Sequence, residues 1–85
     1  MKEQKLPPEY SVKAKKYISK QDSITKKHIK KAIEEIPNGD IVPYERSKNS
    51  FRVRKGDFII IFSWISDDQI IIEKIKPRGD VYKGV

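Results

Sequence analysis

The sequence predicts an α+β fold, in which a helical hairpin packs on a small, mainly antiparallel sheet of four strands in the order β-α-α-β-β-β. Apolar residues recur at helical spacing between residues 7 and 37. The spacing changes to strand-like alternation from Phe51 onward, and short turns separate the apolar runs that follow. The chain has 85 residues, so we expect one domain that covers residues 1–85.

Two helices are expected in the N-terminal half, after a short strand over residues 2–6. The first is expected over residues 7–21, because a Pro-Pro pair suits a first helical turn. The second is expected over residues 22–37, with Asp22 or Ser23 as its N-cap. Their apolar stripes consist of Tyr10, Ala14, Tyr17 and Ile18, and of Ile29, Ala32, Ile33 and Ile36. The short connection between the helices implies an antiparallel hairpin.

Three strands joined by short turns are expected after a linker over residues 38–50. They cover residues 51–54, 57–65 and 69–76. Lys55-Gly56 suits the first turn, because glycine can adopt positive φ. Ser66-Asp67-Asp68 suits the second turn. The three strands therefore form an antiparallel meander.

The chain is strongly basic, with 19 basic and 12 acidic residues, a formal net charge of +7 and a pI near 9.7. This balance is typical of a small domain that binds a phosphate backbone. On the second helix, Lys27, Lys30 and Lys31 are expected to contact a large RNA. A plain solvated helix face, or neutralisation by an acidic protein partner, would explain the same lysines.

The composition excludes several kinds of site. The chain has no cysteine and a single histidine, His28, which is expected to lie solvated on the flank of the second helix. A disulfide framework, a zinc centre or another metal or cofactor is therefore not expected. The N-terminus lacks a hydrophobic signal core, and no apolar run approaches the ~20 residues of a membrane span. We expect a cytoplasmic protein without membrane contact.

Alternation places Arg52 and Arg54 on the face of the sheet that points away from the helices, since Phe51 and Val53 must face the core. On the next strand, one of two apolar sets is left on that same face. An exposed strip of Ile59 and Ile61 beside arginines would suggest a docking surface. The alternative is that a terminal segment folds over this face.

The C-terminal segment ends near a tyrosine, Tyr82, among basic residues. If it folds back onto the arginine face, the phenol would lie near Arg52, Arg54, Lys76 and Arg78. Such cations could stabilise the dianionic transition state of phosphodiester cleavage without a metal. A phenol with a lowered pKa could then act as general base towards a 2′-hydroxyl. A frayed tail is the alternative interpretation of the same residues.

Residues 50–82, "SFRVRKGDFIIIFSWISDDQIIIEKIKPRGDVY", resemble the RelE/ParE superfamily of type II toxin–antitoxin toxins. The resemblance is carried by an alternating basic strand, a Gly-Asp-aromatic turn, a buried strand and a final strand ending in Arg-x-Asp-Val-Tyr. The helical hairpin before them, with "AKKYISK" in its first helix, agrees in length and order. The resemblance covers nearly the whole chain and implies a RelE-like fold.

The resemblance implies one of two activities. RelE-like members are ribosome-dependent endoribonucleases (mRNA interferases) that cut messenger RNA and inhibit translation without a metal. ParE-like members share the fold but inhibit DNA gyrase without catalysis. It also implies partners, namely a cognate antitoxin protein in a hetero-oligomer, the ribosome and its mRNA, and DNA only through the antitoxin complex.

Residue by residue, the resemblance implies catalytic roles for Tyr82, Arg54 and Arg78. It implies RNA-binding roles for Arg52 and Lys76 in the matching basic pairs, and we expect the neighbouring Lys55 to contact RNA as well.

One position departs from the RelE-like pattern. These enzymes commonly carry an arginine directly after the aromatic residue of the Gly-Asp-aromatic turn, where it contacts the scissile phosphate, but here Ile59 follows Phe58. By analogy with the removal of an oxyanion-hole donor, we expect the loss of such a cation to weaken transition-state stabilisation by about 2–4 kcal/mol. Four alternatives remain: a nuclease in which neighbouring cations compensate, a weak nuclease, a gyrase-binding toxin, and a RelE-fold binding module without activity.

Overall fold

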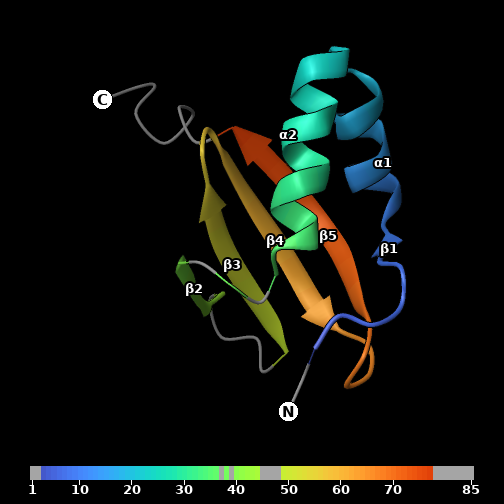
Figure 1. Cartoon of the computed structure of the whole chain (residues 1–85), viewed down its shortest axis with the longest axis vertical. Coiled ribbons are helices and arrows are strands. Elements are labelled where there is room, and N and C mark those ends of the chain that lie inside the picture. The colour runs from blue at the N-terminus through green and yellow to red at the C-terminus, as the bar shows by residue number, and fades with distance from the viewer. Residues whose placement is uncertain (1–2, 37, 39, 45–48, 78–85) are drawn as a thin grey trace.

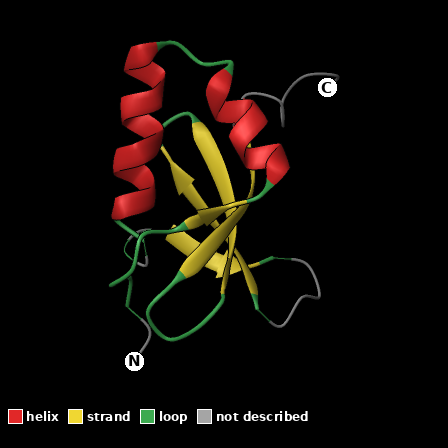
Figure 2. Cartoon of the chain, turned by 90° about the vertical axis from the view of Figure 1, so that its right-hand side faces the viewer, coloured by secondary structure: helices red, strands yellow, loops and turns green. Residues whose placement is uncertain are grey.

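The described residues form a five-stranded mixed sheet with two helices packed on one face (Figures 1 and 2). The computed structural model describes residues 3–36, 38, 40–44 and 49–77. Its elements are β1 Glu9–Tyr10, α1 Val12–Ser19, α2 Ser23–Glu34, β2 Asp40–Pro43, β3 Ser50–Lys55, β4 Phe58–Trp64 and β5 Ile70–Pro77. The strand order is β1-β5-β4-β3-β2, with β1 parallel to β5 and the other neighbours antiparallel. The α+β class, the helical hairpin and the meander are confirmed, and the sheet has one strand more than predicted.

The first helix begins at Val12 and not at the Pro-Pro pair. Ser11 is its N-cap, and the Ser11 hydroxyl accepts a hydrogen bond of 3.1 Å from the backbone N–H of Ala14. The two residues just before this cap, Glu9 and Tyr10, form β1. The prediction of a strand over residues 2–6 is wrong for the part that the structure describes, because extended pairing starts only after the prolines, which lack a backbone N–H.

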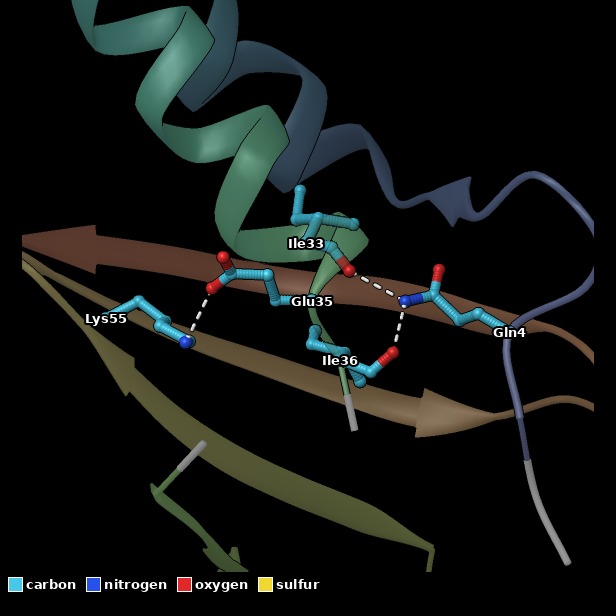
Figure 3. Close-up of polar contacts among 5 residues, drawn as sticks. All are labelled: Gln4, Ile33, Glu35, Ile36 and Lys55. Atoms are coloured by element: carbon cyan, nitrogen blue, oxygen red, sulfur yellow. Dashed lines mark hydrogen bonds and ion pairs between the residues drawn. The ribbon is translucent and has the colours of Figure 1, made fainter. Parts of the chain in front are cut away.

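The second helix has caps at both ends. At its start, the side chain of Asp22 accepts a hydrogen bond of 2.7 Å from the Thr25 N–H, and hydrogen bonding to Thr25 lowers the pKa of Asp22. At its end, the side-chain amide of Gln4 donates to the carbonyls of Ile33 and Ile36, over 2.7 and 2.8 Å (Figure 3). The Ile33 carbonyl also accepts from the Ile36 N–H over 3.2 Å, so Gln4 adds a second donor there and bonds the Ile36 carbonyl just beyond the helix end.

The N-terminal segment is also bound to the turn between β4 and β5. The backbone N–H of Glu3 donates to the Asp67 carbonyl over 2.9 Å, and that of Lys5 donates to the Asp68 carbonyl over 2.8 Å. The side chain of Gln69 donates to the Pro7 carbonyl over 2.8 Å. These hydrogen bonds hold the segment beside the helices and the turn.

The extra strand, β2, lies in the segment predicted to be a linker. It pairs antiparallel with β3, from Asp40 opposite Arg54 to Pro43 opposite Phe51. Ile41 packs against the core, which anchors this short strand. A proline is tolerated at its end because an edge strand does not need every backbone donor.

Strands β3, β4 and β5 form the predicted meander. Gly56 lies in the turn between β3 and β4 with a φ of 55°, as predicted. This left-handed conformation costs a residue with a Cβ about 1–2 kcal/mol. At the second turn, the Ile65 N–H donates to the Gln69 carbonyl over 2.9 Å.

The hydrophobic core lies between the helices and the sheet. Its buried members are Ala14, Ile29, Ala32, Ile33, Ile36, Val53, Ile60, Phe62, Ile70, Ile72 and Ile75. Phe62 connects the aromatic residues, with its ring centre 5.8 Å from that of Phe51 and 6.2 Å from that of Trp64. Val53, Ile60 and Ile75 show which face of each central strand meets the helices.

A β-bulge interrupts the pairing of β4 with β5. Phe62 lies opposite Ile72, whereas its neighbour Ile61 lies opposite Lys74. Glu73 is therefore an extra residue in β5. Side chains alternate along a strand, so without an extra residue Ile72 and Ile75 would lie on opposite faces. With Glu73 inserted, both lie on the core face, and Lys74 lies on the other face.

Ser11 holds the backbone at this bulge. Its hydroxyl donates to the Glu73 carbonyl over 2.6 Å, and its N–H donates to the Ile72 carbonyl over 2.9 Å. The residue that caps α1 therefore also fixes the irregular part of β5.

Candidate nucleic-acid interface

The face of the sheet opposite the helices, here called the outer face, carries the basic side chains of the central strands. Val53 is fully buried in the core, so its neighbours Arg52 and Arg54 point to the outer face. On β5, Ile75 is a core residue, so Lys74 and Lys76 point the same way as the arginines. We call these four residues (Arg52, Arg54, Lys74 and Lys76) the basic quartet.

The basic quartet surrounds two isoleucines of β4. Ile61 lies opposite Arg52 on one side and Lys74 on the other. Ile59 lies in the same way between Arg54 and Lys76. Neighbouring strands lie about 4.8 Å apart, so the arginines of β3 and the lysines of β5 start about 10 Å apart, on either side of the isoleucines of β4.

The prediction of an exposed apolar strip is wrong, because Ile59 and Ile61 are only 4% and 2% exposed. Each isoleucine has a long basic side chain on both sides, and the aliphatic stems of arginine and lysine can cover apolar neighbours while their charged ends stay in water. The outer face therefore presents cations and not a bare apolar patch.

Arg52 carries an unsatisfied donor. Its Nε atom is buried and has no hydrogen-bond partner among the described residues. A buried donor without an acceptor costs about 1–3 kcal/mol, and such groups in native structures need an explanation.

A cluster of two hydroxyls and a carboxylate lies on the outer face beside the basic quartet. The hydroxyl oxygens of Ser50 and Ser63, which are opposite each other on β3 and β4, are 2.9 Å apart. Ser50 Oγ lies 3.4 and 3.3 Å from the two carboxylate oxygens of Glu73, and Ser63 also donates to Glu73. We call Ser50, Ser63 and Glu73 the hydroxyl–carboxylate cluster.

Lys55 lies apart from the basic quartet, on the side of the sheet that faces the helices. Its ammonium group forms an ion pair of 2.6 Å with Glu35 (Figure 3). The hydrogen bond and the charge of Lys55 lower the pKa of Glu35, and Lys31 contributes to a lesser extent. The same two residues line a recess of about 430 Å³ together with His28, Lys31, Ala32, Gly56, Asp57 and Phe58.

The remaining predicted residues are not brought to the basic quartet. Lys27, Lys30 and Lys31 are exposed on α2, which covers the other face of the sheet. His28 is exposed on the same helix, as predicted. Arg78 and Tyr82 lie outside the described residues, so their roles stay predictions.

Sequence reasoning missed four residues of the outer face, namely Lys74, Glu73, Ser50 and Ser63. Alternation counted back from Lys76 past the apolar Ile75 would have pointed to Lys74. Glu73 had no such signal, because the bulge that exposes it breaks the alternation.

No three histidine or acidic side chains lie close enough together to hold a metal ion in the part of the chain that the structure describes. None of the described helices is long and apolar enough to span a membrane.

Comparison with solved structures identifies the fold. One similar chain belongs to the crystal structure of a RelB–RelE antitoxin–toxin complex from Methanococcus jannaschii, with a TM-score of 0.66 and 23% identity over 87% of this chain and 94% of that chain. The chain has the fold of the RelE toxins. A RelE–RelB complex from Pyrococcus horikoshii OT3 shows the same RelE-like fold, with a TM-score of 0.61 and 22% identity over 93% of this chain and 98% of that chain.

The RelE-like fold is found by structure and not by sequence comparison. No protein-family model matches the chain, and a search of curated proteins finds no significant match. The resemblance suggested by the motifs of residues 50–82 is confirmed at the level of fold.

Proposed function

We propose that this protein is the toxin of a type II toxin–antitoxin pair and that it inhibits translation by cutting messenger RNA on the ribosome. The observation that carries the proposal is the basic quartet on the outer face of a RelE-like fold. Four cations from two strands flank one narrow strip, which suits the closely spaced charges of an RNA backbone. Because the proposed reaction takes place on the ribosome, we expect the protein to act in the cytoplasm.

The proposed reaction is transfer of the phosphodiester to the neighbouring 2′-hydroxyl. Tyr82, as its phenolate, takes the proton of the 2′-hydroxyl, the 2′-oxygen forms a bond to phosphorus, and the bond from phosphorus to the 5′-oxygen breaks. The departing 5′-oxygen takes up a proton from water. Arg54 and Arg78 stabilise the negative charge that develops on the phosphoryl oxygens, while Arg52 and Lys76 hold the adjacent phosphates.

The isoleucine that replaces the usual arginine is compatible with this role. Ile59 lies between Arg54 and Lys76 on the neighbouring strands, so a phosphate held above it would have a cation on either side. We infer that these two side chains supply the charge that the missing arginine supplies in other RelE-like enzymes.

An acidic antitoxin is the proposed protein partner. The two similar solved structures are complexes of RelE with RelB, and the net charge of +7 favours a partner of opposite charge. Contact with DNA would occur only through that complex. The exposed lysines of α2, Lys27, Lys30 and Lys31, would face ribosomal RNA.

Gyrase inhibition is the second candidate function, favoured by Ile59 at the arginine position. The two candidate functions differ in whether messenger RNA is cut and in whether Tyr82 is required. A gyrase inhibitor would leave messengers intact and would not need the phenol.

The test is inducible expression in bacteria of the wild type, Tyr82→Phe and Arg54→Ala, with primer extension on an abundant messenger. Lys20→Ala is the matched control, since Lys20 is an exposed cation at the end of α1. We expect growth arrest and cuts within translated codons for the wild type and the control, and loss of both for the other two variants. Arrest in all four strains with uncut messenger would instead favour gyrase as the target, which a supercoiling assay would check. No arrest in any strain would contradict both functions.

A further inference from the structure

The outer face has two chemically different halves. Ser50 is two residues before Arg52 on the same side of β3, and Glu73 directly precedes Lys74 on β5. Two residues along a strand span about 7 Å. The hydroxyl–carboxylate cluster therefore adjoins the basic quartet closely enough for one bound nucleotide to touch both.

Glu73 retains hydrogen-bonding capacity. A carboxylate offers roughly four acceptor sites, and each serine hydroxyl carries one hydrogen. Even if Ser50 and Ser63 both donate to Glu73, about two of its acceptor sites remain open. The side chain is only half-buried, so a ligand in solvent can approach it.

Among the described residues, no basic side chain forms an ion pair with Glu73. The ion pair found among the described residues joins Lys55 to Glu35 on the other side of the sheet, and Glu73 is held by hydroxyls instead. A negative charge beside the basic quartet repels phosphate. The group that meets the cluster must then be a neutral part of the nucleotide that can donate hydrogen bonds.

We propose that Ser50, Ser63 and Glu73 form a nucleobase subsite that takes an amino-bearing base, with cytosine preferred over uracil, while the basic quartet binds the adjoining phosphates. The inference rests on the proposed RNA-cutting function. A carboxylate accepts from the 4-amino group of cytosine, whereas uracil presents a carbonyl oxygen at the same position and is repelled. Bases of single-stranded RNA are recognised through such edges.

The experiment measures binding of the full chain to fluorescently labelled octamers of cytidine and of uridine by anisotropy. These bases have the same size and differ at the edge that the subsite would contact. One hydrogen bond to a charged group is worth about 1.5 kcal/mol or more, which corresponds to tighter binding of the cytidine octamer by about tenfold. An octamer of N4,N4-dimethylcytidine, which lacks the amino hydrogens, should fall to the affinity of the uridine octamer.

Two charge-matched variants complete the design. Glu73→Gln can donate as well as accept, so we expect the cytidine and uridine affinities to agree within about twofold. Glu34→Gln removes the same charge from an exposed position on α2 and should keep the preference. The dimethylcytidine probe needs no variant, so the subsite stays testable if Glu73→Gln does not fold.

The outcomes separate the subsite from the function on which it rests. Equal binding of all three octamers, with weaker binding by Arg52→Ala, would overturn the subsite and leave the RNA-binding face intact. If Glu73→Gln bound the cytidine and uridine octamers more tightly by the same factor, the carboxylate would act only through its charge. That result would also overturn the subsite. No binding to any octamer, or binding indifferent to Arg52→Ala, would count against the proposed function itself.

Discussion

The two faces of the sheet bury equally apolar side chains under different covers. On β4, Ile60 is completely buried beneath the helices, and its neighbour Ile59 is 4% exposed on the outer face. Helical isoleucines and alanines cover the first, whereas Arg54 and Lys76 flank the second. Burial alone therefore does not distinguish a core from a binding face. What distinguishes them is whether the covering groups are themselves apolar and fixed.

The largest effect is expected from the neighbouring pair Ile60→Ala and Ile59→Ala. Ile60→Ala should lower the free energy of unfolding by about 2–5 kcal/mol, because the packed helices cannot close the cavity. Ile59→Ala should cost about 2 kcal/mol or less, since long flanking side chains can move inward. Urea unfolding followed by circular dichroism measures both. Equal losses would mean that the outer face is packed as rigidly as the core.

The next effect concerns Arg54 and Lys55, which are adjacent cations on opposite faces. Arg54→Ala should lower affinity for single-stranded RNA and reduce the salt dependence of binding, by about 0.7 in the log–log slope for each phosphate that the variant no longer neutralises. Lys55→Ala tests whether Lys55 binds RNA as predicted, despite its ion pair with Glu35. Anisotropy titrations at several salt concentrations measure both slopes. If the two slopes fall equally, RNA binding extends to the helix side of the sheet.

A smaller effect is expected at Ser11, which joins α1 to the bulge of β5. Ser11→Ala removes the N-cap acceptor and the donor to the Glu73 carbonyl, and should cost about 1–2 kcal/mol. Ser23→Ala is the control, because Ser23 is exposed at the first position of α2 and is not its cap. Thermal unfolding of both variants is the measurement. A similar shift in both would show that the bulge is held without Ser11.

The smallest effect is the pH dependence of the ion pair between Glu35 and Lys55. Because the pKa of Glu35 is lowered in the folded state, the pair stabilises the fold above the ordinary value of 4.5. That contribution is lost as the pH falls through the lowered pKa. The difference in melting temperature between the wild type and Glu35→Gln should therefore be present at neutral pH and shrink as the pH falls below 4.5. If the difference in melting temperature did not change with pH, the ion pair between Glu35 and Lys55 would not be its cause.

Much of the fold could be predicted because local patterns and long-range packing agree there. The apolar stripe of α2, the cap at Asp22 and the positive φ of Gly56 follow from local chemistry. The two edge strands could not be predicted in the same way. β1 has two residues and β2 has four, which is too short for alternation to show. Each forms by pairing with a longer strand, β1 with β5 and β2 with β3.

The candidate site was predicted less completely, because its geometry depends on one inserted residue. Arg52 and Arg54 follow from alternation. Lys76 was assigned through the RelE-like resemblance, because Pro77 disturbs alternation there, and the structure places all three residues on the outer face. Glu73 and its hydrogen bonds with Ser50 and Ser63 depend on the bulge. A bulge changes the register of everything beyond it, and its position is set by cross-strand pairing that no local window contains.

The bond between Ser11 and Glu73 joins residues 62 positions apart, and the parallel pairing of β1 with β5 spans a similar distance. Closing so long a loop is entropically costly, and folds that depend on distant pairings form slowly for their size. A growing chain cannot complete this sheet until β5 has been made. Until then, Arg52 and Arg54 on β3 lack the lysines of β5 on the far side of β4. The basic quartet is therefore complete only at the last stage of folding.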